Sequence, residues 1–326
     1  MKPVLSRLLP LASLTLSVAL TAASLPTFAA ESNKDVTLKT SKVRDNIYMI
    51  EGANGFAGGN VAVSVGDDGL LVVDSLLKNM TDKLKTSLAK ISNSELRYLL
   101  NTHVHGDHTG GNIKIGQHTP IIAHDNVRKR ISQPHTNKSG TSPAAPESAW
   151  PVLTFNDSMT LYFNDDTVQL QHYPNGHTDG DSIIYFVKAN VLHMGDEFFN
   201  GNFPYVDLSR GGSIVGLSKT IDKIVAKMPK DVLIIPGHGP LADLDDLREY
   251  QQMLQHSITT VRQGISAGKT LAQMQKAGLD KKWLSYGNGF ISSDTHINAT
   301  YLSIKMSGDF REVKKAHKHQ ESTHHH

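Results

Sequence analysis

The 326-residue sequence contains no cysteine. Disulfide bonds and thiolate metal ligands are therefore excluded, so any metal ion must be held by nitrogen and oxygen atoms. A charge excess is also absent, because 33 lysine and arginine residues face 31 aspartate and glutamate residues and no run of five like charges occurs. This balance gives no support to a nucleic-acid partner, and we expect none. The hydrophobic fraction of 39% is typical of a globular protein.

Long apolar runs are likewise missing, except near the N-terminus. Lys2 and Arg7 precede the run LLPLASLTLSVALTAAS, and the tripeptide TFA at 27–29 offers a small residue at both positions of a cleavage site. This pattern predicts a signal peptide over residues 1–29 and a mature protein that is periplasmic or secreted. A membrane anchor is the alternative. However, the run is short, contains Thr and Ser and lacks a following stop-transfer cluster, so we expect no stable membrane insertion after cleavage.

The rest of the chain, residues 30–326, is predicted to form a single domain, because no linker-like segment divides it. Hydrophobic spacing and turn residues predict strands within 36–50, 60–73, 95–103, 158–163, 167–173, 182–195 and 231–238. The helical spacing of apolar residues predicts helices at 78–92, 120–131 and 214–228, within 241–277, and over 289–305. The Pro- and Ser-rich segment 132–151 is predicted to be a long irregular loop.

A cluster of metal-ligand side chains occupies the segment THVHGDHTGG, where a predicted strand ends: His103, His105, Asp107 and His108. The two histidines that are two residues apart point to the same side if the strand continues, and the glycine-rich bend brings the next two ligands round. A catalytic zinc site needs three or four nitrogen or oxygen ligands and keeps one position open. Further candidates, each beside glycine after an apolar strand, are His177, Asp196 and His238. We interpret these seven residues as a metal site built from several strand-end loops.

The motif THVHGDH, together with the downstream segments GHT, GD and PGHG, resembles the metallo-β-lactamase superfamily from about Val43 to Pro240. The resemblance implies an α/β fold, an αββα four-layer sandwich of the metallo-β-lactamase type, with a metal site at the edge of two sheets. It implies that one metal is held by His103, His105 and His177. It implies that the other is held by Asp107, His108 and His238, with Asp196 as the bridge. Asp74 resembles a buried carboxylate that supports the motif loop rather than a ligand.

The residue at the bridging position bears on the substrate. The best-known clinical β-lactamases of this superfamily have a cysteine or serine near this position, whereas Asp196 is similar to the aspartate of glyoxalase II and of quorum-signal lactonases. β-Lactam hydrolysis is therefore a less favoured activity. The expected substrate is a small-molecule acyl compound, namely a lactone, ester, thioester or β-lactam-type amide.

The implied cofactor is a pair of Zn²⁺ ions, with iron or manganese as alternatives. Two zinc ions that share a water lower its pKa from 15.7 to about 7 and polarise a carbonyl group, so hydroxide is available to attack the acyl carbon. Asp107 is the expected catalytic residue, which orients this hydroxide or relays its proton. Hydrogen bonds that fix the ligating imidazoles are expected from nearby polar residues: Thr102, Thr178, Asp74 and Asp181.

Two other functions are left open by the sequence. A mononuclear iron persulfide dioxygenase of the same superfamily needs only His103, His177 and Asp196. A non-catalytic metal-binding module predicts a degraded site, whereas every expected ligand type is present. The segment after the bridging aspartate carries aromatic residues that form either an apolar wall over the metals or part of the core: Phe198, Phe199, Phe203 and Tyr205. The oligomeric state is not indicated.

Overall fold

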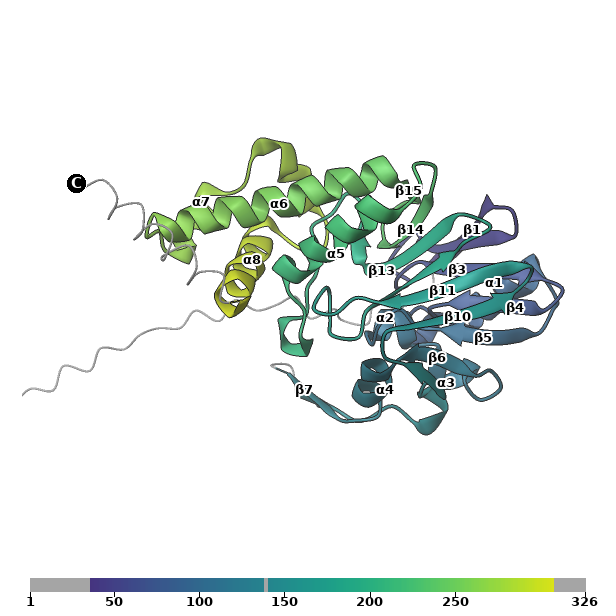
Figure 1. Cartoon of the computed structure of the whole chain (residues 1–326). Coiled ribbons are helices and arrows are strands. Elements are labelled where there is room, and N and C mark those ends of the chain that lie inside the picture. Colours follow the sequence, from purple (N-terminus) through teal and green to yellow (C-terminus); the bar gives the residue numbers. More distant parts are fainter. Residues whose placement is uncertain (1–35, 138–139, 308–326) are drawn as a thin grey trace, which may run out of the picture. The chain divides into compact units, whose positions relative to one another are not determined.

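The computed structural model of the protein describes residues 36–137 and 140–307. The predicted signal peptide and its cleavage site therefore lie outside the described residues. Two β-sheets occupy the centre of the described part, and helices cover their outer faces (Figure 1). None of the described helices combines the length and the apolar character needed to cross a membrane.

The first sheet begins as an antiparallel meander and continues with parallel strands, in the order β1-β2-β3-β4-β5-β6-β9. Its strands are β1 (Thr37–Arg44), β2 (Ile47–Ala53), β3 (Val61–Gly66), β4 (Gly69–Val73), β5 (Leu96–Leu100), β6 (Ile121–His124) and β9 (Leu153–Phe155). Because β4 and β5 run parallel, their carboxyl ends lie side by side at one edge of the sheet. The metal-ligand motif follows β5 at this edge.

The second sheet has the order β10-β11-β12-β13-β14-β15. Its strands are β10 (Ser158–Phe163), β11 (Asp166–His172), β12 (Ser182–Phe186), β13 (Val191–Phe199), β14 (Leu233–His238) and β15 (Ala242–Asp243). Only β13 and β14 pair in parallel among these strands, so their carboxyl ends also meet at one edge. A separate hairpin is formed by β7 (His135–Asn137) and β8 (Gly140–Ser142).

The helices are distributed over both outer faces of the sheets. The α-helices are α1 (Thr81–Ile91), α2 (Gly106–Thr109), α3 (Asn112–Ile115), α4 (Asp125–Ile131), α5 (Ile214–Lys227), α6 (Leu244–Ser266), α7 (Leu271–Ala277) and α8 (Ser293–Ser307). Short 3-10 turns are η1 (Lys78–Met80), η2 (Glu147–Ala149), η3 (Leu208–Arg210) and η4 (Lys281–Asn288).

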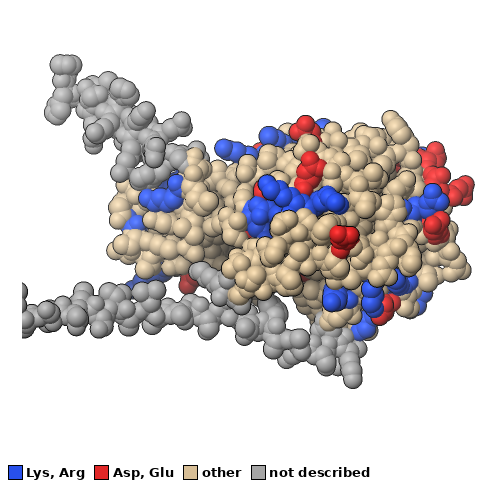
Figure 2. All heavy atoms as spheres, turned by 90° about the horizontal axis from the view of Figure 1, so that it is seen from below, with Lys and Arg blue, Asp and Glu red and all other residues tan. Residues whose placement is uncertain are grey.

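The face that carries α4 and β7 is seen in Figure 2, where lysine and arginine side chains gather across its middle.

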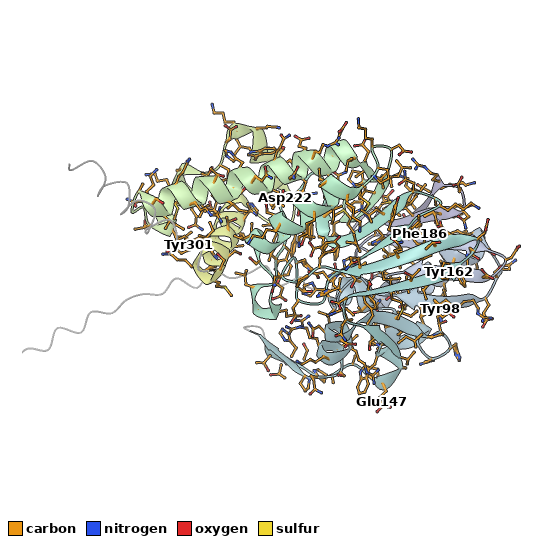
Figure 3. All side chains as sticks on the ribbon, viewed as in Figure 1. Tyr98, Glu147, Tyr162, Phe186, Asp222 and Tyr301 are labelled. Carbon is orange, nitrogen blue, oxygen red and sulfur yellow. The ribbon has the colours of Figure 1, made fainter. Side chains whose placement is uncertain are left out.

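The alternation of side chains along the strands creates three apolar cores between four layers. On β4, Leu71 faces the second sheet, whereas Val72 packs toward α1. On β14, Ile235 belongs to the core between the sheets, whereas Ile234 packs with α5 and α6. Phe186 of β12 is fully buried in the inter-sheet core (Figure 3). The order helix, sheet, sheet, helix confirms the predicted αββα sandwich.

Residues 120–131 are not one helix, as the sequence pattern suggested, but strand β6 followed by α4. The run Ile121–His124 is buried and pairs with β5 and β9, and periodicity cannot separate so short an apolar run from a buried helix. His124 ends the strand and caps the helix, because its Nδ1 accepts a hydrogen bond from the Asn126 amide at 3.2 Å. The segment 132–151 also differs from the prediction, since it contains the β7–β8 hairpin and η2.

The C-terminal helices pack against the segment that follows β13. His296 of α8 is fully buried, and its ring stacks on Phe203 with centroids 4.3 Å apart. Ser257 of α6 donates its hydroxyl proton to the Met253 carbonyl, so it accepts a hydrogen bond from His296 Nε2 at 3.0 Å. Burial lowers the pKa of His296 to about 3. The folded protein therefore holds this imidazole neutral at pH values where an unfolded chain protonates it.

We predict that acidification lowers the free energy of unfolding in part through His296. The pKa of His296 is about 3 when folded, against 6.5 as its ordinary value, so the unfolded state binds the extra proton between these limits. The free energy of unfolding should fall with decreasing pH by about 1 kcal/mol per pH unit more in the wild type than in His296→Gln. Urea unfolding at pH 7, 6 and 5 measures this difference. Exposed His118→Gln is the control and should follow the wild type, and parallel curves for wild type and His296→Gln would contradict the prediction.

Candidate metal centre

The structure brings all seven candidate residues together at the edge shared by the two sheets. Two groups of side chains have ligand atoms that all lie within 4.8 Å of one another: His103, His105, His177 and Asp196 in one, and Asp107, His108 and His238 in the other. The first sheet contributes the residues of the turn after β5, and the second contributes the loop before β12, the strand β13 and the end of β14. His172 and His193 lie in strands outside both groups.

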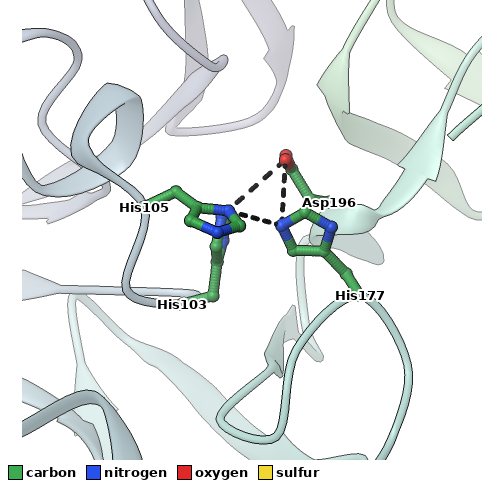
Figure 4. Close-up of side chains that lie close together, drawn as sticks. All are labelled: His103, His105, His177 and Asp196. Carbon is green, nitrogen blue, oxygen red and sulfur yellow. Dashed lines mark hydrogen bonds and ion pairs between the residues drawn. The ribbon is translucent and has the colours of Figure 1, made fainter. Parts of the chain in front are cut away.

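The first group surrounds one carboxylate oxygen (Figure 4). Asp196 Oδ2 lies 3.7 Å from His103 Nε2 and 3.4 Å from His177 Nε2. His105 Nδ1 lies 2.8 Å from His177 Nε2. Two ligand atoms of a tetrahedral zinc ion are about 3.3 Å apart, given zinc–nitrogen distances of about 2.0–2.1 Å. The spacing of these atoms therefore fits a shared cation.

The second group faces the other oxygen of the same carboxylate. Asp196 Oδ1 lies 3.0 Å from His108 Nε2 and 3.4 Å from His238 Nε2. Asp107 Oδ2 lies 3.3 Å from His238 Nε2 and 3.6 Å from His108 Nε2. Asp196 is only 5% exposed and stands between both groups, each oxygen toward one of them. This is the position that a bridging ligand requires.

Hydrogen bonds on the outer side of the rings determine which nitrogen of each imidazole faces inward. Asp74 accepts the hydroxyl proton of Thr102 at 2.7 Å, so the same hydroxyl accepts a hydrogen bond from His103 Nδ1 at 3.0 Å. His177 Nδ1 donates to the backbone carbonyl of Tyr205 at 2.7 Å. Both rings are therefore protonated at Nδ1, and a neutral ring presents the lone pair of Nε2 to the centre.

The same reasoning applies to the other two histidines of the motif. His108 Nδ1 donates to Asp74 Oδ2 at 2.7 Å, which leaves its Nε2 facing Asp196. His105 Nε2 donates to Asp207 Oδ2 at 3.1 Å, which leaves its Nδ1 facing His177. A nitrogen lone pair close to another lone pair or to a carboxylate oxygen is repelled unless a positive charge lies between them. Metal ions provide such a charge, and nitrogen with carboxylate oxygen is a donor set that zinc accepts.

Two buried atoms support this assignment directly. His103 Nε2 and Asp196 Oδ1 are both inaccessible to solvent and have no hydrogen-bond partner within the described part of the chain. A buried polar atom without a partner costs about 1–3 kcal/mol, more when it is charged, unless a ligand or water satisfies it. The residues present therefore fit a divalent cation in each group.

The electrostatics of the site favour the ionised carboxylates. Burial by itself raises the pKa of Asp107, but the neighbouring His108 and His238 outweigh it and lower this pKa to about 2. Burial by itself lowers the pKa of His238, but Asp196 and Asp107 raise it to about 9. Burial also opposes the charged form of Asp196, and the surrounding histidines hold its pKa well below the usual range. The site thus presents anionic ligands at neutral pH and attracts positive charge.

Backbone strain accompanies the site at the end of β4. Asp74 has φ of 66° and Leu76 has φ of 60°, in the left-handed region that costs non-glycine residues energy. Asp74 is fully buried, and its carboxylate accepts from the Thr102 amide at 2.8 Å and from His108. Gly195 also has a positive φ, at an irregularity in the pairing of β13 with β14. This irregularity changes the direction of the Asp196 side chain. Asp196 lies within the strand rather than in a loop after it.

One supporting residue, Asp207, was not among the sequence candidates. Asp207 caps η3 by accepting from the Ser209 and Arg210 amides, and its other oxygen holds His105. An aspartate before a short helical turn is a recognisable cap, but the cap gives no sign of the histidine 102 positions away. Of the expected supports, Thr102 and Asp74 contact ligand rings. Thr178 and Asp181 instead bond to each other at 2.5 Å.

The aromatic residues after Asp196 divide between the core and the site. Phe198 and Phe203 are buried in the core, the first within β13 and the second against His296. Phe199 ends β13 and is buried in the same core, and its ring also stacks on His238 with centroids 5.1 Å apart. Tyr205 is 38% exposed and lies 5.7 Å from the His105 ring. Phe56, which precedes β3, also stacks on His238, with ring centroids 5.8 Å apart.

Comparison with known proteins identifies the family. The family described as Metallo-beta-lactamase superfamily matches residues 54–238, more than half of the chain, and this range contains all seven candidate ligands. The chain belongs to the metallo-beta-lactamase superfamily. Members of this superfamily are metal-dependent hydrolases, which agrees with the donor sets described above.

Curated relatives within the superfamily carry different names. An uncharacterized protein of Aquifex aeolicus is 29% identical over 42% of this chain and 65% of its own length. The metallo-beta-lactamase type 2 of Bacteroides fragilis is 23% identical over 48% of this chain and 58% of its own length. A hydroxyacylglutathione hydrolase of a Polaromonas species is 28% identical over 51% of this chain and 57% of its own length. In each case the match spans less than two thirds of the relative.

Solved structures confirm the superfamily fold. A metallo-beta-lactamase from Pontibacter korlensis superposes with a TM-score of 0.57 and 17% identity, over 67% of this chain and 99% of that structure. A double mutant of the sec-alkyl sulfatase PisA1 superposes with a TM-score of 0.61 and 16% identity, over 81% of this chain and 50% of that structure. At this level of identity the comparison supports the fold alone.

We predict that two glycines near the candidate ligands differ sharply in their tolerance of substitution by alanine. A Cβ atom at Gly59 would lie 2.0 Å from His108 Cε1, whereas one at Gly106, inside the motif itself, meets nothing within 4 Å. Gly59→Ala should therefore displace His108, destabilise the protein by about 1–3 kcal/mol and lower its metal content. Gly106→Ala should retain both stability and metal. Urea unfolding and metal analysis of the purified variants check this, and equal metal content in the two variants would refute it.

Proposed function

We propose that the chain is an exported hydrolase that uses two divalent cations, zinc in the first instance, to cleave a small-molecule acyl substrate. The observation that carries the proposal is the position of Asp196, with one carboxylate oxygen facing each of two histidine-containing groups. Export rests on the sequence of residues 1–29. The substrate classes are lactone, ester, thioester and β-lactam-type amide.

The proposed ligands follow from the inward-facing atoms. His103, His105 and His177 would hold one cation. Asp107, His108 and His238 would hold the other, and Asp196 would bind both. Bound divalent cations of this kind supply hydroxide at neutral pH and polarise the carbonyl under attack.

The remaining chemistry falls to residues of the chain. Asp107 is the more exposed of the two central carboxylates, at 22% against 5% for Asp196, so it can reach a substrate. We assign to the carboxylate of Asp107 the role of accepting a proton and passing it to the leaving group. Phe56, which is exposed and stacks on His238, offers an apolar surface for the acyl part, and the buried Phe199 packs on the same ring.

The second group of ligands separates this proposal from its alternatives. A single-iron persulfide dioxygenase would need His103, His177 and Asp196, which the structure places together, but it gives no reason for Asp107, His108 and His238 to converge as well. A non-catalytic metal-binding module predicts a degraded site, whereas all seven candidate ligands converge in two groups. The names of the relatives include both a metallo-beta-lactamase and a hydroxyacylglutathione hydrolase, which supports an acyl substrate without choosing between them.

Metal analysis tests the two-cation assignment. The purified wild-type protein should contain about two zinc ions per chain, and Asp196→Asn should lose most of both because its carboxylate faces each group. His238→Ala should retain about one ion. Exposed His118→Gln, outside both groups, is the matched control and should retain two. One iron per chain in the wild type, with oxygen uptake on a persulfide, would establish the dioxygenase instead.

A substrate panel tests the reaction. The zinc-loaded protein should hydrolyse at least one class among lactones, thioesters, aryl esters and a chromogenic cephalosporin, and we expect the cephalosporin not to be the best. Asp107→Asn should lower kcat by roughly 100-fold or more, because it removes the proton acceptor. Steady-state kinetics on the same panel measures both effects. Failure of the fully loaded protein on every class would remove the proposed activity.

A further inference from the structure

A cavity of about 250 Å³ near the metal centre has three cationic side chains among its polar lining residues. Lys129 and Arg130 of α4 and Arg210 of η3 border it, together with His135 of β7 and Asp179. The face that carries α4 and β7 shows lysine and arginine side chains gathered across its middle (Figure 2). The cavity belongs to neither group of candidate ligands.

Specific contacts hold the walls of this cavity in place. Arg130 donates two hydrogen bonds to Asp179, at 2.7 and 2.5 Å. The Asp179 amide donates to the Arg210 carbonyl at 2.9 Å, and the Asp179 carbonyl accepts from Asn126 at 2.8 Å. The two arginines therefore stand on a fixed backbone frame, although they are 80 positions apart in the chain.

The cavity has more positive than negative charge. Lys129, Arg130 and Arg210 face Asp179, with Asp207 behind them. Lys129 is exposed, and no carboxylate of residues 36–137 or 140–307 lies within ion-pair distance of its ammonium group. Arg210 Nε is buried without a hydrogen-bond acceptor, and Asp207 Oδ2 is 3.6 Å away. Cationic donors in excess of their acceptors are suited to binding an anion.

The carboxylate of Asp207 links Arg210, a wall residue of the cavity, to the metal centre. Asp207 Oδ2 accepts from His105 Nε2 at 3.1 Å and lies 3.6 Å from Arg210 Nε. The opposite nitrogen of His105 faces the first group of ligands. An anion held by these cations is therefore separated from the metal centre by little more than the side chains of Asp207 and His105. Phe199 and Phe56 occupy the other side of the centre, at His238.

We propose that the Lys129–Arg130–Arg210 cavity binds a carboxylate group of the substrate at a distance from the scissile acyl bond. This inference rests on the proposed hydrolase function and specifies its substrate as an anionic acyl compound. The carboxylate pairs with the cationic side chains, while the apolar part of the molecule lies toward the aromatic residues at His238. Binding energy from the remote carboxylate then orients the acyl group over the metal centre.

The test compares two esters that differ only in charge. 4-Nitrophenyl hydrogen adipate carries a free terminal carboxylate, and 4-nitrophenyl methyl adipate is its neutral counterpart. The zinc-loaded wild type should prefer the anionic ester in kcat/KM, chiefly through KM, and added salt should weaken the preference. The double variant Lys129→Gln/Arg130→Gln should lower the preference by about tenfold.

The matched control removes two positive charges from residues that do not line the cavity. Arg248 of α6 and Lys282 of η4 also form ion pairs, so Arg248→Gln/Lys282→Gln has the same net charge as the test variant. The control should keep the wild-type preference. Lys129→Gln alone breaks no ion pair, so it should fold normally and show part of the effect. Equal preference in wild type, test variant and control would overturn the proposal.

A binding measurement separates this inference from the proposed function. Adipate itself should bind to the zinc-loaded wild type and control, as measured by calorimetry, and about tenfold more weakly to the double variant. If the wild type hydrolyses neither ester, the hydrolase proposal loses its support from this ester class, whereas the adipate result still decides the cavity. Equal adipate affinity in the wild type and the double variant would refute the anion site, even with an active enzyme.

Discussion

The structure depends on one electrostatic constraint: several unshared electron pairs point at the same small volume. Asp196 is buried between His103 and His177 on one side and His108 and His238 on the other. Such an arrangement is unfavourable in a low-dielectric interior unless positive charge compensates it. Protons on His108 and His238, whose pKa values the carboxylates raise, or cations bound between the ligand atoms supply this positive charge.

The orientation of the candidate ligands is determined by the residues that hydrogen-bond to their rings from outside the two groups. Asp74 accepts from both Thr102 and His108, so one carboxylate controls two imidazoles, directly and through a hydroxyl. The strained backbone of Asp74 is tolerated because these hydrogen bonds outweigh its cost. The two sheets are joined at the same place, since Asn60 before β3 donates to the Gly237 and Pro236 carbonyls. The packing of the two sheets and the geometry of the metal centre therefore depend on contacts in the same region.

The surroundings of the centre are asymmetric. Aromatic rings lie against His238, whereas His105 leads through Asp207 to a cationic cavity. In a fold that hosts many reactions, such surroundings rather than the shared ligands determine which molecules are bound. This asymmetry is the basis of the proposed preference for an amphipathic, anionic molecule over a neutral one.

The sequence by itself determined the candidate ligands, because THVHGDH is a local pattern and the three later ligands each stand beside glycine after an apolar run. The fold class followed from the family resemblance that this motif carries. It could not separate β6 from α4, since a short buried apolar run has no distinguishing period. Asp207, the Tyr205 carbonyl and the Arg130–Arg210 cavity were decided only by the tertiary structure. Each joins residues from distant parts of the chain, and hydrogen bonds between such residues leave no trace in local spacing.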